Sequence, residues 1–246
     1  ALTLQAIGGP DPRDPTTLCE PLPDLLAGVG ESIQGLRLGW DEMYATRDLA
    51  DDFAQAVHES LEVLERLGAK VVRLTMPERL RDYLEAWQVL CATEAYEAHR
   101  AFYPERAEEY GPWFREWLRR GAGYSAADYA HAHHLRLQCN GEMRAMLSEV
   151  DALVCPSTAR EAYPMPLADA YGPIPADRDP WQSRYTVPMD YAGVPTLSLP
   201  CGLSRAGLPL SVQLVGNLLA EGTLIRLGAA FERATEWSSL HPPGWD

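Results

Sequence analysis

A lysine side chain is one of the groups that could act as a base toward a nucleophile in this chain. Lys70 is its only lysine, and it stands at the start of a predicted strand. A lysine acts as a base near neutral pH only when it is desolvated and touches the nucleophile. We expect Lys70 to lie at the surface with its alkyl stem along the protein instead. The chain therefore offers no lysine base, and we assign it no catalytic residue.

Three histidines gather in one helical stretch, at positions 131, 133 and 134. On a helix His131 and His134 share a face while His133 points elsewhere. No carboxylate stands with them as in the zinc motif His-Glu-x-x-His. We interpret them as helix-surface histidines and expect neither a metal nor another cofactor.

The cysteines are odd in number and scattered, at positions 19, 91, 139, 155 and 201. No Cys-x-x-Cys pair suggests a zinc site or a redox centre. Buried and reduced thiols of a cytoplasmic protein are the favoured interpretation.

The net charge of −14 argues against a nucleic acid or an anionic membrane as partner. No apolar run approaches the ~20 residues that span a bilayer, and no signal peptide is visible.

Two charged helical stretches are expected to be solvated or internally paired faces. The first holds Glu94, Glu97 and His99; the second, which could otherwise form a basic patch, holds Arg115, Arg119 and Arg120.

Hydrophobic periodicity predicts the elements that must position any site. Strands are expected at residues 36–40 and 71–74, joined by a helix at 48–67, and this unit should be a right-handed crossover with parallel strands. Helices follow at 80–102, 105–120 and 125–148, with Gly121 and Gly123 separating the last two and Ser125 with Asp128 capping the third. A strand at 152–155, two strands at 196–199 and 210–215, and a last helix at 219–235 complete the pattern. The fold class is therefore α/β with a mixed central sheet flanked by helices. No repeat or domain boundary is visible, and residues 1–246 are expected to be a portion of a single domain.

Three spaced motifs surround the last two strands. They are Pro-x-x-x-Ala-Gly-x-Pro at 188–195, Leu-Pro-Cys-Gly at 199–202, and Gly-Leu-Pro-x-x-x-Gln-Leu-Val-Gly at 207–216. Together they resemble the carboxy-terminal part of the amidase signature family, which hydrolyses carboxylic amides. Further matching stretches are residues 9–16, Glu94-Ala95, residues 151–158, Glu221, and Trp237 with His241-Pro242.

The resemblance implies a serine nucleophile, a second serine in a cis peptide, and a lysine base. Family members carry these serines in a Gly- and Ser-rich stretch upstream of the matched region. This chain has no Gly-Gly-Ser-Ser, and its only Ser-Ser pair, Ser238-Ser239, lacks flanking glycines. The chain also begins at Ala1 without Met, part-way along an apolar segment that should be the end of a helix. We therefore expect a fragment from which the catalytic half is absent.

Residues 156–188 hold seven prolines and form the longest predicted loop. We expect a rigid wall of the substrate site, with a loop that merely wraps the sheet edge as the alternative. The resemblance places Ser157 and Thr158 near the active site. Our candidate substrate-binding residues are Tyr124, Ser157, Thr158 and Asp190. Asp190 stands where this family more often has Asn, which bears on the type of substrate.

The function implied by the resemblance is hydrolysis of a small-molecule amide to an acid and an amine or ammonia through an acyl-enzyme. Within the family, the A subunit of a tRNA-dependent amidotransferase is an alternative. A stand-alone binding or scaffold module without catalysis is another, and it would require the isolated chain to fold cooperatively. Trp113 and Trp117, four residues apart, could pack in the core or in the interface of a homodimer.

Overall fold

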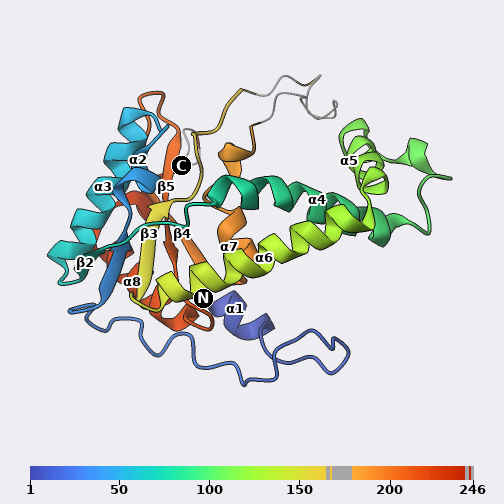
Figure 1. The fold of residues 1–246 in the computed structure, drawn as a ribbon. Coiled ribbons are helices and arrows are strands. Elements are labelled where there is room, and N and C mark those ends of the chain that lie inside the picture. The colour runs from blue at the N-terminus through green and yellow to red at the C-terminus, as the bar shows by residue number, and fades with distance from the viewer. Residues whose placement is uncertain (165–166, 168–178, 242–243, 245–246) are drawn as a thin grey trace. The chain divides into compact units, whose positions relative to one another are not determined.

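The chain divides into two compact units, each assembled from segments that are far apart in the sequence (Figure 1). The computed structural model describes residues 1–164, 167, 179–241 and 244. The first unit comprises Ala1–Thr75, Arg144–Ser157 and Val194–Asp246, and the second comprises Met76–Met143 and Thr158–Gly193. Because both units draw on separated segments, no boundary appears along the chain.

The first unit is built on a mixed five-stranded sheet in the order β2-β1-β3-β5-β4. Its strands are β1 (Arg37–Trp40), β2 (Lys70–Arg73), β3 (Ala152–Pro156), β4 (Thr196–Leu203) and β5 (Pro209–Val215). β1 pairs in parallel with β2 and β3, whereas β5 runs antiparallel to both β3 and β4. The predicted α/β class with a mixed sheet is confirmed, as is the parallel pairing of the first two strands.

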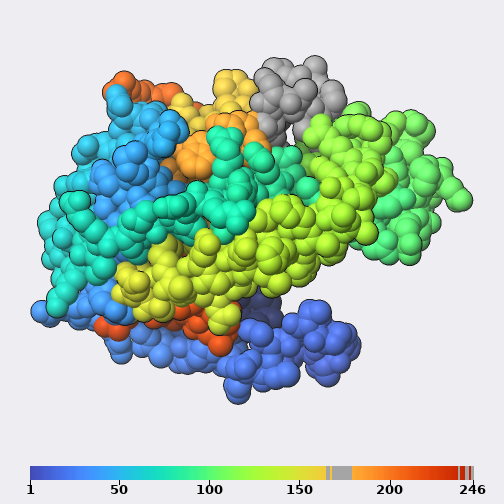
Figure 2. All heavy atoms as spheres, viewed as in Figure 1, coloured from blue at the N-terminus to red at the C-terminus, as the bar shows by residue number. Residues whose placement is uncertain are grey.

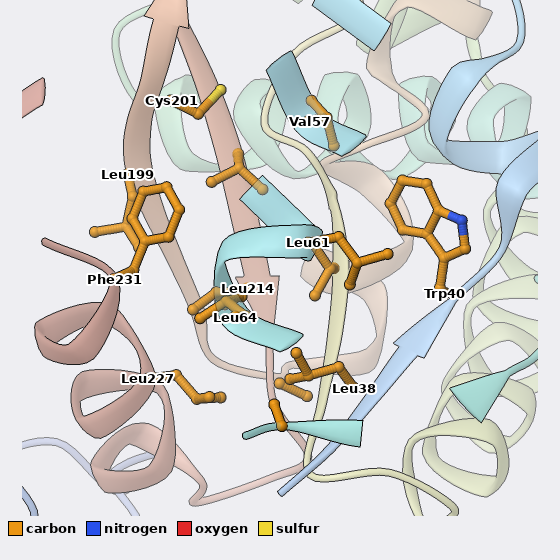
Figure 3. Packing of buried hydrophobic residues seen from close by; sticks show 14 of the residues in the cluster. Leu38, Trp40, Val57, Leu61, Leu64, Leu199, Cys201, Leu214, Leu227 and Phe231 are labelled. Carbon is orange, nitrogen blue, oxygen red and sulfur yellow. The ribbon is translucent and has the colours of Figure 1, made fainter. Parts of the chain in front are cut away.

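Two long helices cover one face of this sheet and form its core (Figure 3). They are α3 (Asp51–Arg66) and α8 (Glu221–Ala234). Period-two alternation sends Leu38, Leu199 and Leu214 to this face. There they pack with Leu61 of α3 and Leu227 of α8, and all five side chains are buried. The shorter elements of the unit are α1 (Leu2–Ile7), α2 (Glu42–Thr46) and a 3₁₀ turn at Trp237–Ser239.

The β4–β5 hairpin runs further than the alternation predicts. β4 continues to Leu203, past the predicted end at residue 199, with a register shift between Pro200 and Gly202. Proline is tolerated there because β4 is an edge strand, so the missing N–H breaks no ladder. The turn is closed by Ser204, whose Oγ accepts hydrogen bonds from the backbone N–H of Ala206 and Leu208, both at 3.2 Å.

The second unit is helical. It contains α4 (Leu80–His99), α5 (Pro112–Gly123), most of α6 (Ala126–Leu147) and α7 (Val187–Ala192), with 3₁₀ turns at Ala107–Glu109 and Pro180–Ser183. Helices α4 and α6 are antiparallel, since the Tyr83 hydroxyl donates to Glu142 at 2.8 Å and the Tyr129 hydroxyl donates to Glu94 at 3.2 Å.

The capping prediction for α6 is confirmed by reciprocal hydrogen bonds. The Asp128 N–H donates to Ser125 Oγ at 3.2 Å, and the Ser125 N–H donates to an Asp128 carboxylate oxygen at 2.9 Å. Each side chain thus satisfies a backbone donor at the start of the helix.

Two helix predictions in this unit need correction. The helix expected at 105–120 begins only at Pro112, because Gly111 and Pro112 interrupt the chain and proline fits the first helical turn. It ends at Gly123, so Gly121 lies inside the helix and does not separate it from α6. The expected loop at 156–188 also ends early, since α7 starts at Val187.

Candidate substrate-pocket residues

The sheet face opposite the α3 and α8 helices carries polar side chains, which we call the polar face. Register places Gln213 of β5 between Cys155 of β3 and Ser198 of β4. The Gln213 side-chain amide donates to Cys155 Sγ at 3.5 Å. Ser198 is exposed, whereas Cys155 and Gln213 are buried. The alternation along β4 and β5 predicted that these two strands form a ribbon, which is confirmed, but nothing in the sequence showed that β3 lies beside β5.

Ser157, the first predicted binding residue, joins the polar face directly after β3. Its backbone N–H donates to the Ser211 carbonyl at 3.1 Å, which continues the β3–β5 pairing by one residue. Its hydroxyl donates to Ser198 Oγ, also at 3.1 Å. Ser157 is only 8% exposed, so this bond satisfies a nearly buried hydroxyl. Ser198 was not among the predicted residues.

No base accompanies these hydroxyls in the described part of the chain. Lys70 is exposed on β2, at the opposite edge of the sheet from β4, as expected of a surface lysine. Burial raises the pKa of the Cys155 thiol to about 12, so this group stays neutral near pH 7. The pair Ser157–Ser198 can therefore bind a polar group, but it lacks the activated nucleophile that acyl transfer needs.

Asp190 belongs to the second unit and lies on α7. The other five residues of that helix are buried, whereas Asp190 is exposed. No described side chain forms an ion pair with its carboxylate. Its neighbours still remove part of its hydration, and this partial burial raises the pKa of the carboxyl above its usual value. The result is an incompletely solvated carboxylate that a hydrogen-bond donor or a cation could satisfy.

The next residue, Tyr191, is a polar group that sequence reasoning missed. It is 1% exposed, and its ring meets the Trp87 ring edge-on at a centroid distance of 5.2 Å. Its hydroxyl oxygen is buried with no hydrogen-bond partner among the described residues. A buried tyrosine hydroxyl usually finds a partner, so this oxygen has unused capacity to bind one.

The remaining two candidates are not drawn together with Asp190. Tyr124 is half-buried and ends α5, while Thr158 is exposed and donates its hydroxyl to the Arg160 carbonyl at 2.8 Å. Among the described residues, no hydrogen bond or ring contact joins Tyr124, Thr158 and Asp190 to one another. Their place in one pocket stays a prediction.

The proline-rich segment lies partly outside the described residues, including Pro166, Tyr171, Pro173 and Pro175. In its described part Tyr185 is fully buried, whereas Tyr163 is 58% exposed. Trp181 receives the guanidinium of Arg81 over its ring at 5.6 Å. The end of the segment nearest α7 is therefore packed, while its role as a wall of the site stays a prediction.

Other charged residues behave as solvated or paired faces. His131 and His134 are exposed, and no group of three metal-binding side chains occurs in the described ranges. The arginines of α5 are paired, with Arg115 held by Glu108 at 3.0 Å and both Arg119 and Arg120 held by Glu116. These ion pairs leave no basic patch there.

All five cysteines are free, as expected, but they are not all buried. Cys139, Cys155 and Cys201 are buried, Cys91 is half-buried, and Cys19 is exposed. The expectation of burial is wrong for Cys19, which stands in a segment of the chain without helix or strand.

Comparison with known proteins shows the family to which this chain belongs. A family model described as Amidase matches residues 1–225. The A subunit of glutamyl-tRNA(Gln) amidotransferase from Cyanothece sp. is 33% identical over 272 residues, covering 98% of this chain and 54% of that protein. Its counterpart from Pseudomonas syringae pv. tomato is 32% identical over 269 residues, covering 100% and 54%. The chain belongs to the amidase family, that of the amidase signature enzymes.

Solved structures agree on the fold. A bacterial aryl acylamidase of the amidase signature family matches with a TM-score of 0.78 at 23% identity, covering 97% of this chain and 51% of that one. The A subunit of glutamyl-tRNA(Gln) amidotransferase from Thermotoga maritima matches with a TM-score of 0.75 at 27% identity, covering 95% and 50%. The chain thus spans about half the length of the relatives it matches. No helix in the described residues is long and apolar enough to cross a membrane.

Proposed function

We propose that this chain is part of an amidase that hydrolyses a small carboxylic amide through a serine acyl-enzyme. The observation that carries the proposal is the family match over residues 1–225. The polar face is consistent with it, because the hydroxyls of Ser157 and Ser198 could bind a polar group of the substrate. No base lies beside them in the described residues, so we assign them no catalytic role.

In this reaction a serine hydroxyl adds to the amide carbonyl, and an ester bond to the serine forms as the C–N bond breaks. The proton of the serine passes through the lysine base to the departing amine or ammonia. Water then cleaves the ester, which releases the acid and returns a proton to the serine oxygen. Hydrogen-bond donors aimed at the developing oxyanion typically contribute a few kcal/mol each.

The residues of this chain have a binding role in that scheme. The hydroxyls of Ser157 and Ser198 and the carboxylate of Asp190 would orient the substrate, with Tyr124 and Thr158 as further lining. The sheet strands would complete a larger sheet, because β4 presents an unpaired edge in the described structure. The serine nucleophile, the second serine and the lysine base would come from outside these 246 residues.

The test is an activity assay on the product of the complete gene that encodes this sequence. The purified protein, without partners, is offered a panel of small aliphatic and aromatic amides, and the release of amine or ammonia is followed. We expect hydrolysis of at least one class. Absence of hydrolysis across the panel by a folded protein would contradict the proposal.

A second candidate function is favoured by two of the relatives, which are A subunits of glutamyl-tRNA(Gln) amidotransferase at 33% and 32% identity. Such a subunit would pass ammonia to a partner protein. The same assay separates the two, since an amidotransferase subunit would need its partner subunits for full activity while a free-standing amidase would not.

A further inference from the structure

A groove lined by residues of α4 and α6 lies in the second unit. The two helices run side by side in the ribbon view (Figure 1), and atoms of both lie at the visible surface in the space-filling view (Figure 2). Its volume is about 410 Å³. The floor is apolar and consists of Ala86 and Val89 from α4 with Ala132 and Leu135 from α6. Ala86 and Ala132 are buried and have small side chains, so the two helices leave room between them. We call this feature the α4–α6 groove.

The α4 rim of the groove is acidic. Asp82 and Glu85 both line it. Asp82 is paired with Arg79 at 3.0 Å, and the same guanidinium reaches Gln138 of α6 at 3.1 Å. Glu85 is exposed and has no hydrogen bond or ion pair to any described residue. One carboxylate of this rim is therefore neutralised, and the other is available.

The α6 rim adds a further carboxylate. Asp128 lines the groove, and its bonds from the Ser125 N–H and hydroxyl hold its pKa below the usual value, so it is ionised at neutral pH. The neighbouring rim residue is His131, which is exposed. Three carboxylates line the groove against two basic side chains, Arg79 and His131, so the groove carries a net negative charge at neutral pH.

We propose that the α4–α6 groove binds a small aliphatic amine, with its methylene chain on the apolar floor and its ammonium group at Glu85. Charge complementarity selects a cation over a neutral or anionic ligand of the same length. The volume lies within the range of small-molecule sites, which are mostly apolar with a few placed polar groups. This inference rests on residues outside the proposed amide site and stands independently of the proposed function.

The experiment compares three probes of equal chain length: hexylamine, 1-hexanol and hexanoate. Each is titrated into the isotopically labelled product of the complete gene, and amide chemical-shift changes are followed at neutral pH. We expect saturable shifts at groove residues with hexylamine, weaker ones with hexanol and none with hexanoate. Raising the ionic strength should weaken hexylamine binding, because an exposed ion pair is screened by salt.

The variant Glu85→Gln isolates the charge at the α4 rim. Glu97→Gln is the control for net charge, since Glu97 is an exposed carboxylate of the same helix that does not line the groove and is paired with Arg100 at 3.1 Å. Removal of one exposed ion-pair partner should weaken hexylamine binding about two- to fivefold in Glu85→Gln and leave Glu97→Gln unchanged. Circular dichroism verifies that both variants keep the helical content of the parent chain.

Three results would overturn the inference. One is the absence of saturable shifts with hexylamine at millimolar concentration. Another is equal binding of hexylamine and 1-hexanol, which would show that the floor acts without the charges. The third is an equal loss of affinity in the Glu85 and Glu97 variants, which would assign the effect to net charge and not to the groove.

Discussion

At the scale of single residues, the bond between Ser157 and Ser198 explains how a nearly buried hydroxyl is accommodated on a sheet face. The two residues are 41 positions apart in the sequence: Ser157 directly follows β3, and Ser198 lies on β4. Neither touches a lysine or a histidine in the described structure. This is consistent with the binding role that we propose for them.

Removal of either hydroxyl should have a modest effect. Ser157→Ala should lower the free energy of unfolding by about 1 kcal/mol, because a buried hydrogen bond is lost, and Ser198→Ala should cost less because that residue is exposed. Urea unfolding of the two variants and of the double variant measures the coupling. In the complete protein we expect an increase in KM of up to roughly tenfold for each variant, with kcat largely kept. A loss of kcat by several orders of magnitude would contradict a binding role.

Asp190 gives a prediction on pH. Burial raises the pKa of its carboxyl in the folded chain. Above this raised pKa the carboxyl is ionised in both states, and its ionisation lowers the free energy of unfolding. This loss of stability disappears as the pH falls below the pKa of the unfolded chain, because the carboxyl is then protonated in both states. Asp190→Asn should therefore be more stable than the parent at pH 7, with the difference shrinking as the solution is acidified through the carboxyl range. Thermal unfolding at neutral and acidic pH measures this. A variant that is less stable than the parent at pH 7 would show that the carboxylate has a cationic partner.

At the scale of elements, periodicity predicted most of the strands and helices, while local interruptions and tertiary neighbours set their ends. Gly121 shows the limit of local reasoning. Its residue type predicts a helix break, yet it lies inside α5. Glycine is needed at this position because a side chain would meet the Ala92 carbonyl oxygen of α4. Glycine therefore allows the two helices to approach closely. No pattern within α5 contains that information.

A matched pair of glycine variants tests this interpretation. Gly121→Ala should destabilise the chain by about 1–3 kcal/mol or more, since the added methyl group would meet backbone that cannot yield easily. Gly123→Ala in the same helix has open space around the new methyl group and should be neutral or slightly stabilising. Equal effects in urea unfolding would mean that helix propensity, and not the α4–α5 contact, governs both positions.

The α7 helix escaped prediction for a different reason. Six residues with a proline near the start give too short a window for helical periodicity, and the preceding prolines favour a loop. The helix packs against α4, and all of its residues except Asp190 are buried. This packing, and not a local pattern, determines where Asp190 and Tyr191 lie. The placement of candidate residues on short elements thus depends on contacts that the sequence does not display.

At the scale of the whole molecule, the family could be predicted because several spaced motifs agreed along most of the chain. The pairing of Ser157 with Ser198 could not be predicted, because the two residues belong to segments whose neighbours are set by topology. The sheet order brings β3, β5 and β4 together, and only that order joins Ser157 to Ser198. The match to about half the length of the relatives supports our assignment of a binding role to this part and of the nucleophile to another.

The most direct test of this account is to label the product of the complete gene with a fluorophosphonate and to map the modified serine. We expect stoichiometric labelling, loss of amide hydrolysis, and a modified serine outside the 246 residues described above. A label on Ser157 or Ser198, or an active amidase that takes no label, would contradict the account.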